Sequence, residues 1–380
     1  MRQRAGTLAR AAALAALGGV ARTAAVAAAA LGALALLLAA CGYDAAGALH
    51  ALWNGALGSP YAFFSGTLVR ATPLLLTGLA VTLAFQAGVL NVGAEGQLLA
   101  GATAAAAVAL GAGERLAAAT LPLALAAAAA GGALWAWPAA LLRRRFGVLE
   151  VISTIMLNFA ALHAVSYVVR GPLQEPLHIY PQTASIPAAA QLPRLAHGTR
   201  LHAGFLLALA LAALLWWTLR ATAAGFRLRA SGANPAAAAS AGLIDVGRTT
   251  TGAFLASGAL AGLAGGVELC GVTYALYENI SPGYGYTAIA VALLARLDPA
   301  ATVASAVLFG ALEAGAGAMQ RDAGIPSVVV SVVEAMLILI LLAADRLRST
   351  PRSALSWLRG GSPPTPAHPP APPAPAERAP

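Results

Sequence analysis

Runs of about twenty apolar residues follow one another along most of this chain, separated by short polar connections. A run of that length is what one helix needs to cross a bilayer. Only 10% of the 380 residues are charged and 59% are hydrophobic, whereas a soluble domain carries about 25% charged residues. The sequence therefore predicts an all-α fold, a polytopic bundle of transmembrane helices.

We expect about ten spans, and the third and the eighth are interrupted. The eighth is too short to cross the bilayer without the loop before it. A basic segment, 1–23, precedes the membrane domain, 24–344, and a Pro-rich tail, 345–380, that we expect to be disordered follows it. The expected spans are 24–41, 67–85, 88–110, 117–141, 149–169, 201–219, 250–272, 284–296, 300–318 and 326–344.

Polar residues and glycines interrupt the chain at two places. Residues 85–101 contain Asn91, Glu95 and Gln97 among glycines, and residues 279–294 contain a Pro-Gly-Gly loop that opens into an apolar helix. Within a membrane, such backbone and side chains are tolerated only where they face protein or a water-filled cavity. A pair of interrupted segments in the two halves of a chain is typical of a transport site.

We predict a substrate pathway at these interruptions. Its candidate residues are Asn91, Glu95, Gln97, Asn158, Tyr284 and Tyr286. The tyrosines could stack on a base or a sugar, but an interfacial aromatic belt explains them equally well. Asn158 could bond across helices as readily as contact substrate, and the interruptions themselves could be tightly packed bends.

Four glutamates fall inside the expected spans and must face the bundle interior: Glu95, Glu268, Glu313 and Glu334. Gly258, Gly262 and Gly266 recur at every fourth position, which predicts a close-packing face between helices. We interpret Glu268, which follows this stripe, as an interhelix contact and not as a ligand group.

The distribution of charge predicts the topology. All 23 basic residues are arginines; with the N-terminus inside, the expected spans place 17 of them in the cytoplasm and 6 outside. The positive-inside rule then favours two cytoplasmic termini and an even number of spans. Because these charges lie in short loops, the net charge of +9 indicates topology and not nucleic-acid binding.

Several chemistries are excluded by what the chain lacks. Without lysine it has no phosphate-loop lysine, so ATP would have to be hydrolysed by another chain. Cys41 and Cys270 are too few for a disulfide framework or a zinc site, and no H-E-x-x-H or G-x-S-x-G motif occurs. We predict no metal site, no cofactor in this chain and no enzyme activity. Residues 38–42 resemble a lipoprotein cleavage box, which leaves acylation of Cys41 as an alternative.

A basic connection at 220–250 predicts a docking segment. Asn234 and Pro235 form a good helix start, and Gly242 is placed to end the helix. This short helix between arginines suits contact with a soluble partner, although a loop that only fixes orientation is the alternative. The candidate coupling residues are Arg227, Arg229, Asn234, Pro235, Gly242 and Arg248. A second long connection, 170–200, carries five prolines and reads as an ordered external loop.

Five motifs resemble the permease subunits of bacterial ABC importers, in the simple-sugar and nucleoside branch. They are N-V-G-A-E-G-Q at 91–97, V-L-E-V-I-S-T-I-M-L-N-F at 148–159, S-G-A-N-P with A-G-L at 231–243, G-A-L-A-G-L-A-G-G-V-E at 258–268 and G-Y-T-A-I-A-V-A-L-L at 285–294. Their order and spacing cover most of 67–344. One departure is the run from Ala236 to Ser240, where the family usually has a carboxylate and a basic or aromatic residue.

The resemblance implies a multi-pass protein of the bacterial inner membrane. It implies as partners two ABC ATPase subunits that bind ATP and Mg, a second permease subunit, and an external substrate-binding lipoprotein. The substrate would be a nucleoside or a simple sugar. The rival class is an ion-coupled secondary transporter, which would use the intramembrane glutamates as proton or sodium relays but would not need the 231–243 segment.

Overall fold

The computed structural model describes residues 32–242 and 244–326, and in addition the single residues 28, 328, 332 and 335. The chain divides into two units, Met1–Ile338 and Leu339–Pro380, of which the second lies wholly outside the described residues. The basic segment 1–23, the tail 345–380, Glu334 and nearly all of the predicted last span also lie outside them.

The regular secondary structure of the described residues is helical. Two isolated β-bridges occur, Gln182–Tyr277 and Arg194–His202. No strand occurs among the described residues. The all-α prediction is confirmed. The elements are α2 (Ala45–Ala56), η1 (Ala62–Thr67), α3 (Leu68–Gln86), α4 (Ala94–Ala112), η2 (Gly113–Ala119), α5 (Thr120–Phe146), α6 (Glu150–Arg170), η3 (Ala188–Ala190), α7 (Gly204–Ala221), α8 (Ala223–Ala233), α9 (Pro235–Ser240), α10 (Val246–Glu268), η4 (Leu269–Thr273), α11 (Tyr284–Leu294) and α12 (Pro299–Ala323).

Six helical stretches in the described part are long and apolar enough to cross a membrane: Ala62–Gln86, Ala117–Phe146, Glu150–Arg170, Gly204–Ala221, Val246–Thr273 and Pro299–Ala323. Each matches one of the expected spans. The predicted eighth span is the short apolar helix α11 of 11 residues, so the expectation that it cannot cross alone is confirmed. The count of ten stays a prediction.

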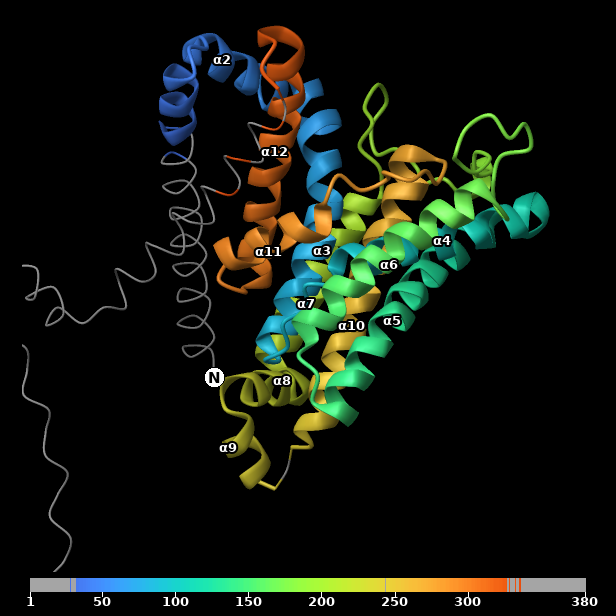
Figure 1. Ribbon diagram of the computed structural model, residues 1–380, viewed down its shortest axis with the longest axis vertical. Coiled ribbons are helices and arrows are strands. Elements are labelled where there is room, and N and C mark those ends of the chain that lie inside the picture. Colours follow the sequence, from blue (N-terminus) through green and yellow to red (C-terminus); the bar gives the residue numbers. More distant parts are fainter. Residues whose placement is uncertain are drawn as a thin grey trace, which may run out of the picture. The chain divides into compact units, whose positions relative to one another are not determined.

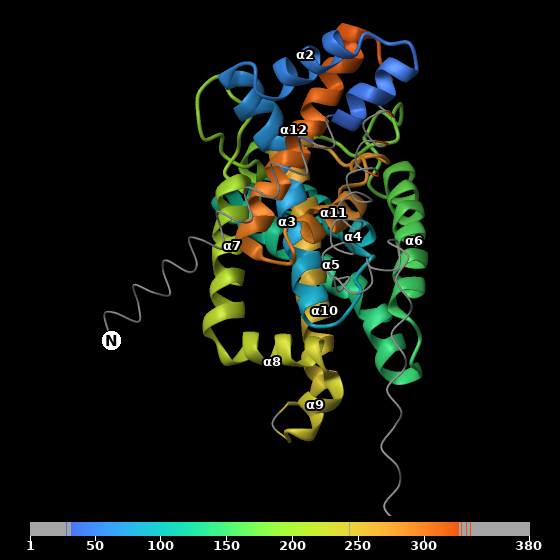
Figure 2. The same cartoon turned by 90° about the vertical axis from the view of Figure 1, so that its left-hand side faces the viewer.

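Helix α3 lies at the centre of the bundle and is buried along nearly its whole length. It contacts α10, α11, α12 and α7, while α10 also packs against α4 and α5 (Figures 1 and 2). Helices α8 and α9 lie at the lower end in Figure 1, and α2 and the end of α12 at the upper end. Loops 171–203 and 274–283 lie toward that upper end as well.

The predicted glycine stripe is a close-packing face, as expected. A Cβ on Gly262 of α10 would stand 2.3 Å from the carbonyl oxygen of Ala128 on α5, and one on Gly258 would stand 2.7 Å from the carbonyl oxygen of Gly132. Small residues let two membrane helices approach to backbone contact. This seam fixes α10 against α5 and thereby the position of everything that α10 carries.

Short polar side chains begin α10 and α12. Asp245 accepts a hydrogen bond from Arg248 N at 2.9 Å, and Asp298 accepts from Ala300 N at 2.9 Å with Pro299 in the first turn of α12. Such caps satisfy amide groups that have no partner within the helix. Arg220 also pairs with Asp298 at 2.6 Å, which ties the end of α7 to the start of α12.

Candidate functional site

The helix interruption between α3 and α4 covers residues 87–93. Gly88 takes a φ of +74°, a left-handed conformation that favours glycine, and α4 begins only at Ala94. The predicted interruption is confirmed, but the predicted start of the third span at residue 88 is wrong. The reason is that the left-handed Gly88 turns the chain out of α3, and the polar side chains described next hold the following residues outside a helix.

Asn91 ties this interruption to two helices. Its amide nitrogen donates to Gln97 Oε1 and to Ser257 Oγ, both at 2.8 Å, and its amide oxygen accepts from Gly93 N and Gln97 Nε2, both at 3.0 Å. Ser257, on α10, donates in turn to the carbonyl of Ala80 on α3 at 2.6 Å. The amide groups of Asn91 and Gln97 are buried and bonded to each other within the protein.

Asn158 of α6 satisfies the backbone of the same interruption. Its oxygen accepts from Gly96 N at 2.9 Å, and its nitrogen donates to the Val92 carbonyl at 3.0 Å. The same nitrogen lies 3.3 Å from the hydroxyl of Tyr286 on α11. A side chain from a neighbouring helix thus supplies partners for backbone groups that a broken helix leaves unpaired.

Glu95 joins the two interrupted helices directly. Its Oε2 accepts a hydrogen bond of 2.7 Å from Gly285 N, in the first turn of α11. A carboxylate is stabilised there because the amide end of a helix carries partial positive charge. The approach requires glycine, since a Cβ on Gly285 would stand 2.2 Å from Glu95 N.

Five of the six predicted pathway residues therefore belong to one hydrogen-bonded cluster, which we call the break cluster: Asn91, Glu95, Gln97, Asn158 and Tyr286. The first four are buried, and Tyr286 is partly exposed. The cluster holds α4, α6, α10 and α11 together through these hydrogen bonds. Tyr284, the sixth residue, is buried and lines a cavity described below.

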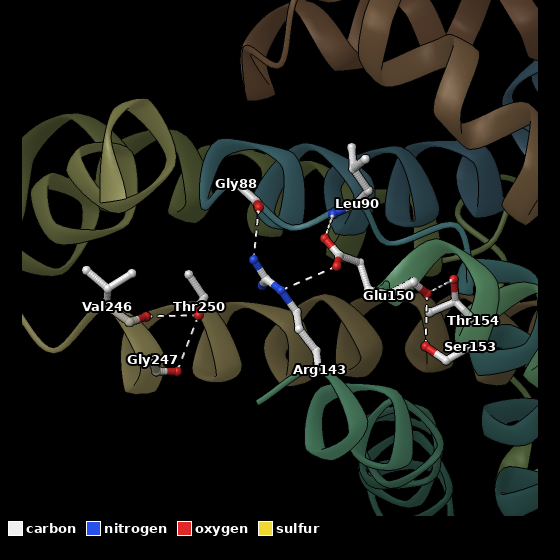
Figure 3. A network of polar contacts seen from close by, with 9 residues as sticks. All are labelled: Gly88, Leu90, Arg143, Glu150, Ser153, Thr154, Val246, Gly247 and Thr250. Carbon is white, nitrogen blue, oxygen red and sulfur yellow. Dashed lines mark hydrogen bonds and ion pairs between the residues drawn. The ribbon is translucent and has the colours of Figure 1, made fainter. Parts of the chain in front are cut away.

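Arg143 connects the interruption to the α5–α6 turn (Figure 3). Its guanidinium donates to the Gly88 carbonyl at 3.4 Å and pairs with Glu150 at 3.3 Å, while Glu150 accepts from Leu90 N at 3.2 Å. The backbone of the interruption is thus held at two points by one ion pair. Arg143 was predicted only as a topology-determining charge, so its structural role was missed.

The predicted coupling segment forms two short helices at the lower end of the bundle (Figure 2). Asn234 accepts from Ala237 N at 3.0 Å, Pro235 opens α9, and Gly242 takes a φ of +71°, as the sequence predicts for a helix start and stop. In α9 only Ala238 is buried, so its other alanines form a small apolar surface.

The arginines of this segment differ in their surroundings. Arg248 is paired with Asp245 at 3.2 Å within the start of α10. Arg227 and Arg229 are exposed on α8, next to the exposed ring of Phe226. The sequence did not predict α8 as a helix, because the segment is too short to read as a span and contains two glycines. Thr222 caps it by accepting from Gly225 N at 3.1 Å.

Helix α8 ends against the interruption. A Cβ on Gly232 would stand 2.2 Å from the carbonyl oxygen of Gln86, and a Cβ on Gly88 would stand 3.0 Å from Cα of Gly232. These two backbones touch with no side chain between them. A displacement of α8 therefore acts directly on the residue where α3 ends and the interruption begins.

A cavity of about 920 Å³ lies near the opposite end of the described chain from α9. It is lined by α2, η1 and α3, the ends of α10 and α12, and the 274–287 segment. Arg70, Arg200, Glu268, Glu313 and Tyr284 are among its lining residues. Glu268 lines this cavity and makes no side-chain hydrogen bond to another helix among the described residues, so its role as an interhelix contact stays a prediction. Arg70 lies within the expected span 67–85, and an arginine within an apolar run is itself a signal of function.

The long loop 171–203 is fastened to the 270–278 segment. Thr183 N donates to the Leu276 carbonyl at 2.9 Å, and Leu192 N to the Cys270 carbonyl at 2.8 Å. Glu278 accepts from Arg170 at 2.7 Å and from Ser166 at 2.6 Å, and these hydrogen bonds lower the pKa of Glu278 to about 2. The described residues contain no group of three or more potential metal ligands.

Comparison with known proteins defines the class. The family model described as "Branched-chain amino acid transport system / permease component" matches residues 63–342. The guanosine ABC transporter permease protein NupP of Bacillus subtilis is 40% identical over 318 residues, which is 83% of this chain and 90% of that protein. The glucose ABC transporter permease protein TsgB13 of Haloferax volcanii is 35% identical over 73% of this chain and 75% of its own length. The nucleoside ABC transporter permease protein NupB of Lactococcus lactis is 32% identical over 81% of this chain and 86% of its own length.

The fold and these matches define a permease component of an ABC transporter, a multi-pass membrane protein that is not itself an enzyme. The chain belongs to the branched-chain amino acid transport permease family. As such a component it functions with an ATPase and a substrate-binding protein. The family resemblance inferred from the sequence motifs is confirmed.

Proposed function

We propose that this chain is the membrane-spanning subunit of an ATP-driven importer for a nucleoside or a simple sugar. The relatives named for guanosine, nucleoside and glucose transport support this substrate range. The substrate is delivered by an external binding lipoprotein and passes through a permease pair made of this chain and a second copy or a homologue. The match of the family model across 63–342, which includes both interruptions and the α8–α9 segment, carries the proposal.

The proposed topology has ten spans and both termini in the cytoplasm of a bacterial cell. The excess of arginines on that side of the expected spans supports it. In this orientation α8 and α9 face the cytoplasm, while loops 171–203 and 274–283 face the binding protein. The fastening of these two loops to each other gives the binding protein one continuous surface to contact.

Two ATPase subunits, which hold ATP and Mg, dock on α8 and α9 of the two permeases. The exposed alanines of α9 offer apolar packing, and Arg227 and Arg229 offer charge on α8. Asn234 caps the start of α9, Pro235 is its first residue, and Gly242 follows its end. At the start of α10, Arg248 forms an ion pair with Asp245. The contact of Gly232 with Gly88 provides a direct route from this surface to the helix interruption.

The break cluster acts as the closed gate of the pathway. In the described conformation Asn91, Gln97 and Asn158 are buried and paired, so the pathway is shut at this level. Glu95 holds the start of α11, and Tyr284 on the same turn reaches the cavity above. Motion of α8 opens the gate by shifting Gly88 and the residues that follow it.

Co-reconstitution tests this function. The chain, its genomic neighbours encoding an ATPase and a binding protein, and a second permease if one is encoded there, are placed in proteoliposomes with ATP on the ATPase side. We expect guanosine, another nucleoside or a simple sugar to stimulate ATP hydrolysis and to accumulate in the lumen when the binding protein is present. Stimulation by branched-chain amino acids alone would reject the substrate range.

A further inference from the structure

The cavity of about 920 Å³ is a chemically mixed site with a buried floor and an exposed rim. Glu268 and Tyr284 on the floor are 5% and 6% exposed, whereas Gln320 and Arg321 on the rim are exposed. A small molecule arriving from the surface could therefore reach the floor side chains. The volume lies within the range of about 300–1,000 Å³ that is usual for small-molecule sites.

The charges that line the cavity balance one another. Three arginines, Arg70, Arg200 and Arg321, face three carboxylates, Glu268, Glu313 and Asp322. Arg70 is fixed by a hydrogen bond of 2.7 Å to the backbone carbonyl of Glu313. A site whose formal charges cancel gives an ionic ligand no net electrostatic advantage. The lining therefore favours an uncharged polar ligand.

The floor carboxylate has unused hydrogen-bonding capacity. The Glu268 carboxylate has no hydrogen-bond partner among the described residues, although a carboxylate buried in a membrane protein costs free energy unless it is paired. A carboxyl group can accept hydrogen bonds through its oxygens, so a group rich in O–H or N–H donors complements it. Tyr284 and Tyr277 line the same cavity, and an aromatic ring can pack against a planar base or the face of a sugar.

We infer that this cavity is a substrate site within the single permease chain, which takes an uncharged, hydroxyl-bearing ring compound such as a nucleoside. This inference rests on the function proposed above. Glu268 accepts hydrogen bonds from the hydroxyl groups of the ligand, and Tyr284 packs against its ring. Because Gly285, the next residue, is bonded to Glu95, the site lies directly above the break cluster.

Cysteine protection in the permease–ATPase complex tests the inference. The two native cysteines, Cys41 and Cys270, are first replaced, and Thr287→Cys is introduced in the cavity lining. The complex in nanodiscs is then exposed to a small aqueous thiol reagent, with and without guanosine. The matched control is Thr199→Cys, a half-buried threonine of loop 171–203 that is not among the lining residues. If Thr287→Cys does not assemble, Val272→Cys serves as the second cavity probe.

We expect guanosine to slow labelling at the cavity position and not at Thr199→Cys, and we expect guanosine monophosphate to give no protection. Adding Glu268→Gln should raise the half-protecting guanosine concentration about tenfold, as expected for the loss of a hydrogen bond to a charged group. Three results would overturn the inference. They are a cavity cysteine that the reagent does not label, equal protection by guanosine monophosphate, and no protection in a complex that still imports guanosine. In the last case the proposed function stands; if the complete wild-type system transports no nucleoside or sugar, the proposed function fails instead.

Discussion

The backbone of Gly232, at the end of α8, lies directly against the backbone of Gly88, where the interrupted helix begins. A Cβ on Gly232 would stand 2.9 Å from Gly88 N and 2.2 Å from the carbonyl oxygen of Gln86. In the proposed transport cycle, this contact transmits the work of the ATPase to the membrane pathway. A substitution that forces the two backbones apart should therefore weaken coupling.

Replacing Gly232 with alanine should separate α8 from the interruption. The added methyl group would overlap backbone atoms that cannot move aside cheaply, which typically costs about 1–3 kcal/mol. We expect ATP hydrolysis by the assembled complex to persist while transport per ATP falls severalfold. The control is Gly252→Ala on α10, where a Cβ would meet nothing within 4 Å. Unchanged transport per ATP in the Gly232 variant would remove this contact from the coupling route.

Glu95 should be needed as an acceptor and not as a negative charge. Glu95→Gln keeps an oxygen for Gly285 N, whereas Glu95→Leu leaves the start of α11 without it. Leaving a buried N–H without its acceptor costs about 1–3 kcal/mol. We therefore expect the leucine variant to lower the thermal stability of the complex and abolish uptake, and the glutamine variant to keep much of both. Equal loss in the two variants would indicate that Glu95 acts through its charge, as in a proton relay.

Cysteines at Asn91 and Gln97 should be inert to small aqueous thiol reagents in the resting complex. Both positions are almost completely buried, at 0% and 1% exposure, and their side chains bond to each other. If the break cluster is a gate, reactivity should appear when the complex is trapped with a non-hydrolysable nucleotide. Persistent inertness in variants that still transport would make this cluster a packed bend and move the pathway to the cavity.

The attachment of the 274–283 loop should weaken in acid. The hydrogen bond from Arg170, and to a smaller extent the one from Ser166, lowers the pKa of Glu278 from its ordinary value of 4.5 to about 2. Because the folded-state pKa is the lower one, the stabilisation is complete above pH 4.5 and is lost as the pH falls from 4.5 through 2. Hydrogen-exchange protection of residues 274–283 should fall over this window. Glu278→Gln should show the low protection at every pH; an unchanged profile would contradict the assignment.

The helices were largely predictable because their cause is local. Six apolar runs, such as 149–169 for Glu150–Arg170, predicted helices within a few residues of the observed ends. The ends of α9 followed from Asn234 and Gly242, whose capping and left-handed conformations are properties of single residues. Polar residues within an apolar run predicted both interruptions for the same reason.

Features that depend on distant residues were not predictable from one sequence. The cavity joins Arg70, Arg200 and Glu268, which share no local pattern and come together only when α3, the 171–203 loop and α10 pack. The Gly88–Gly232 contact likewise requires the fold, and a lone glycine gives no sign of its partner. Helix α2, Ala45–Ala56, was missed because it is too short to read as a span.

The central claim is that transport by this chain is driven by a partner ATPase. The most direct measurement is uptake of radiolabelled guanosine into proteoliposomes that contain either this chain alone or the complete complex with its ATPase and binding protein. We expect uptake only with the complete complex and ATP, and none from the chain alone under an imposed proton or sodium gradient. Gradient-driven uptake by the isolated chain, independent of ATP, would contradict this claim and favour an ion-coupled transporter.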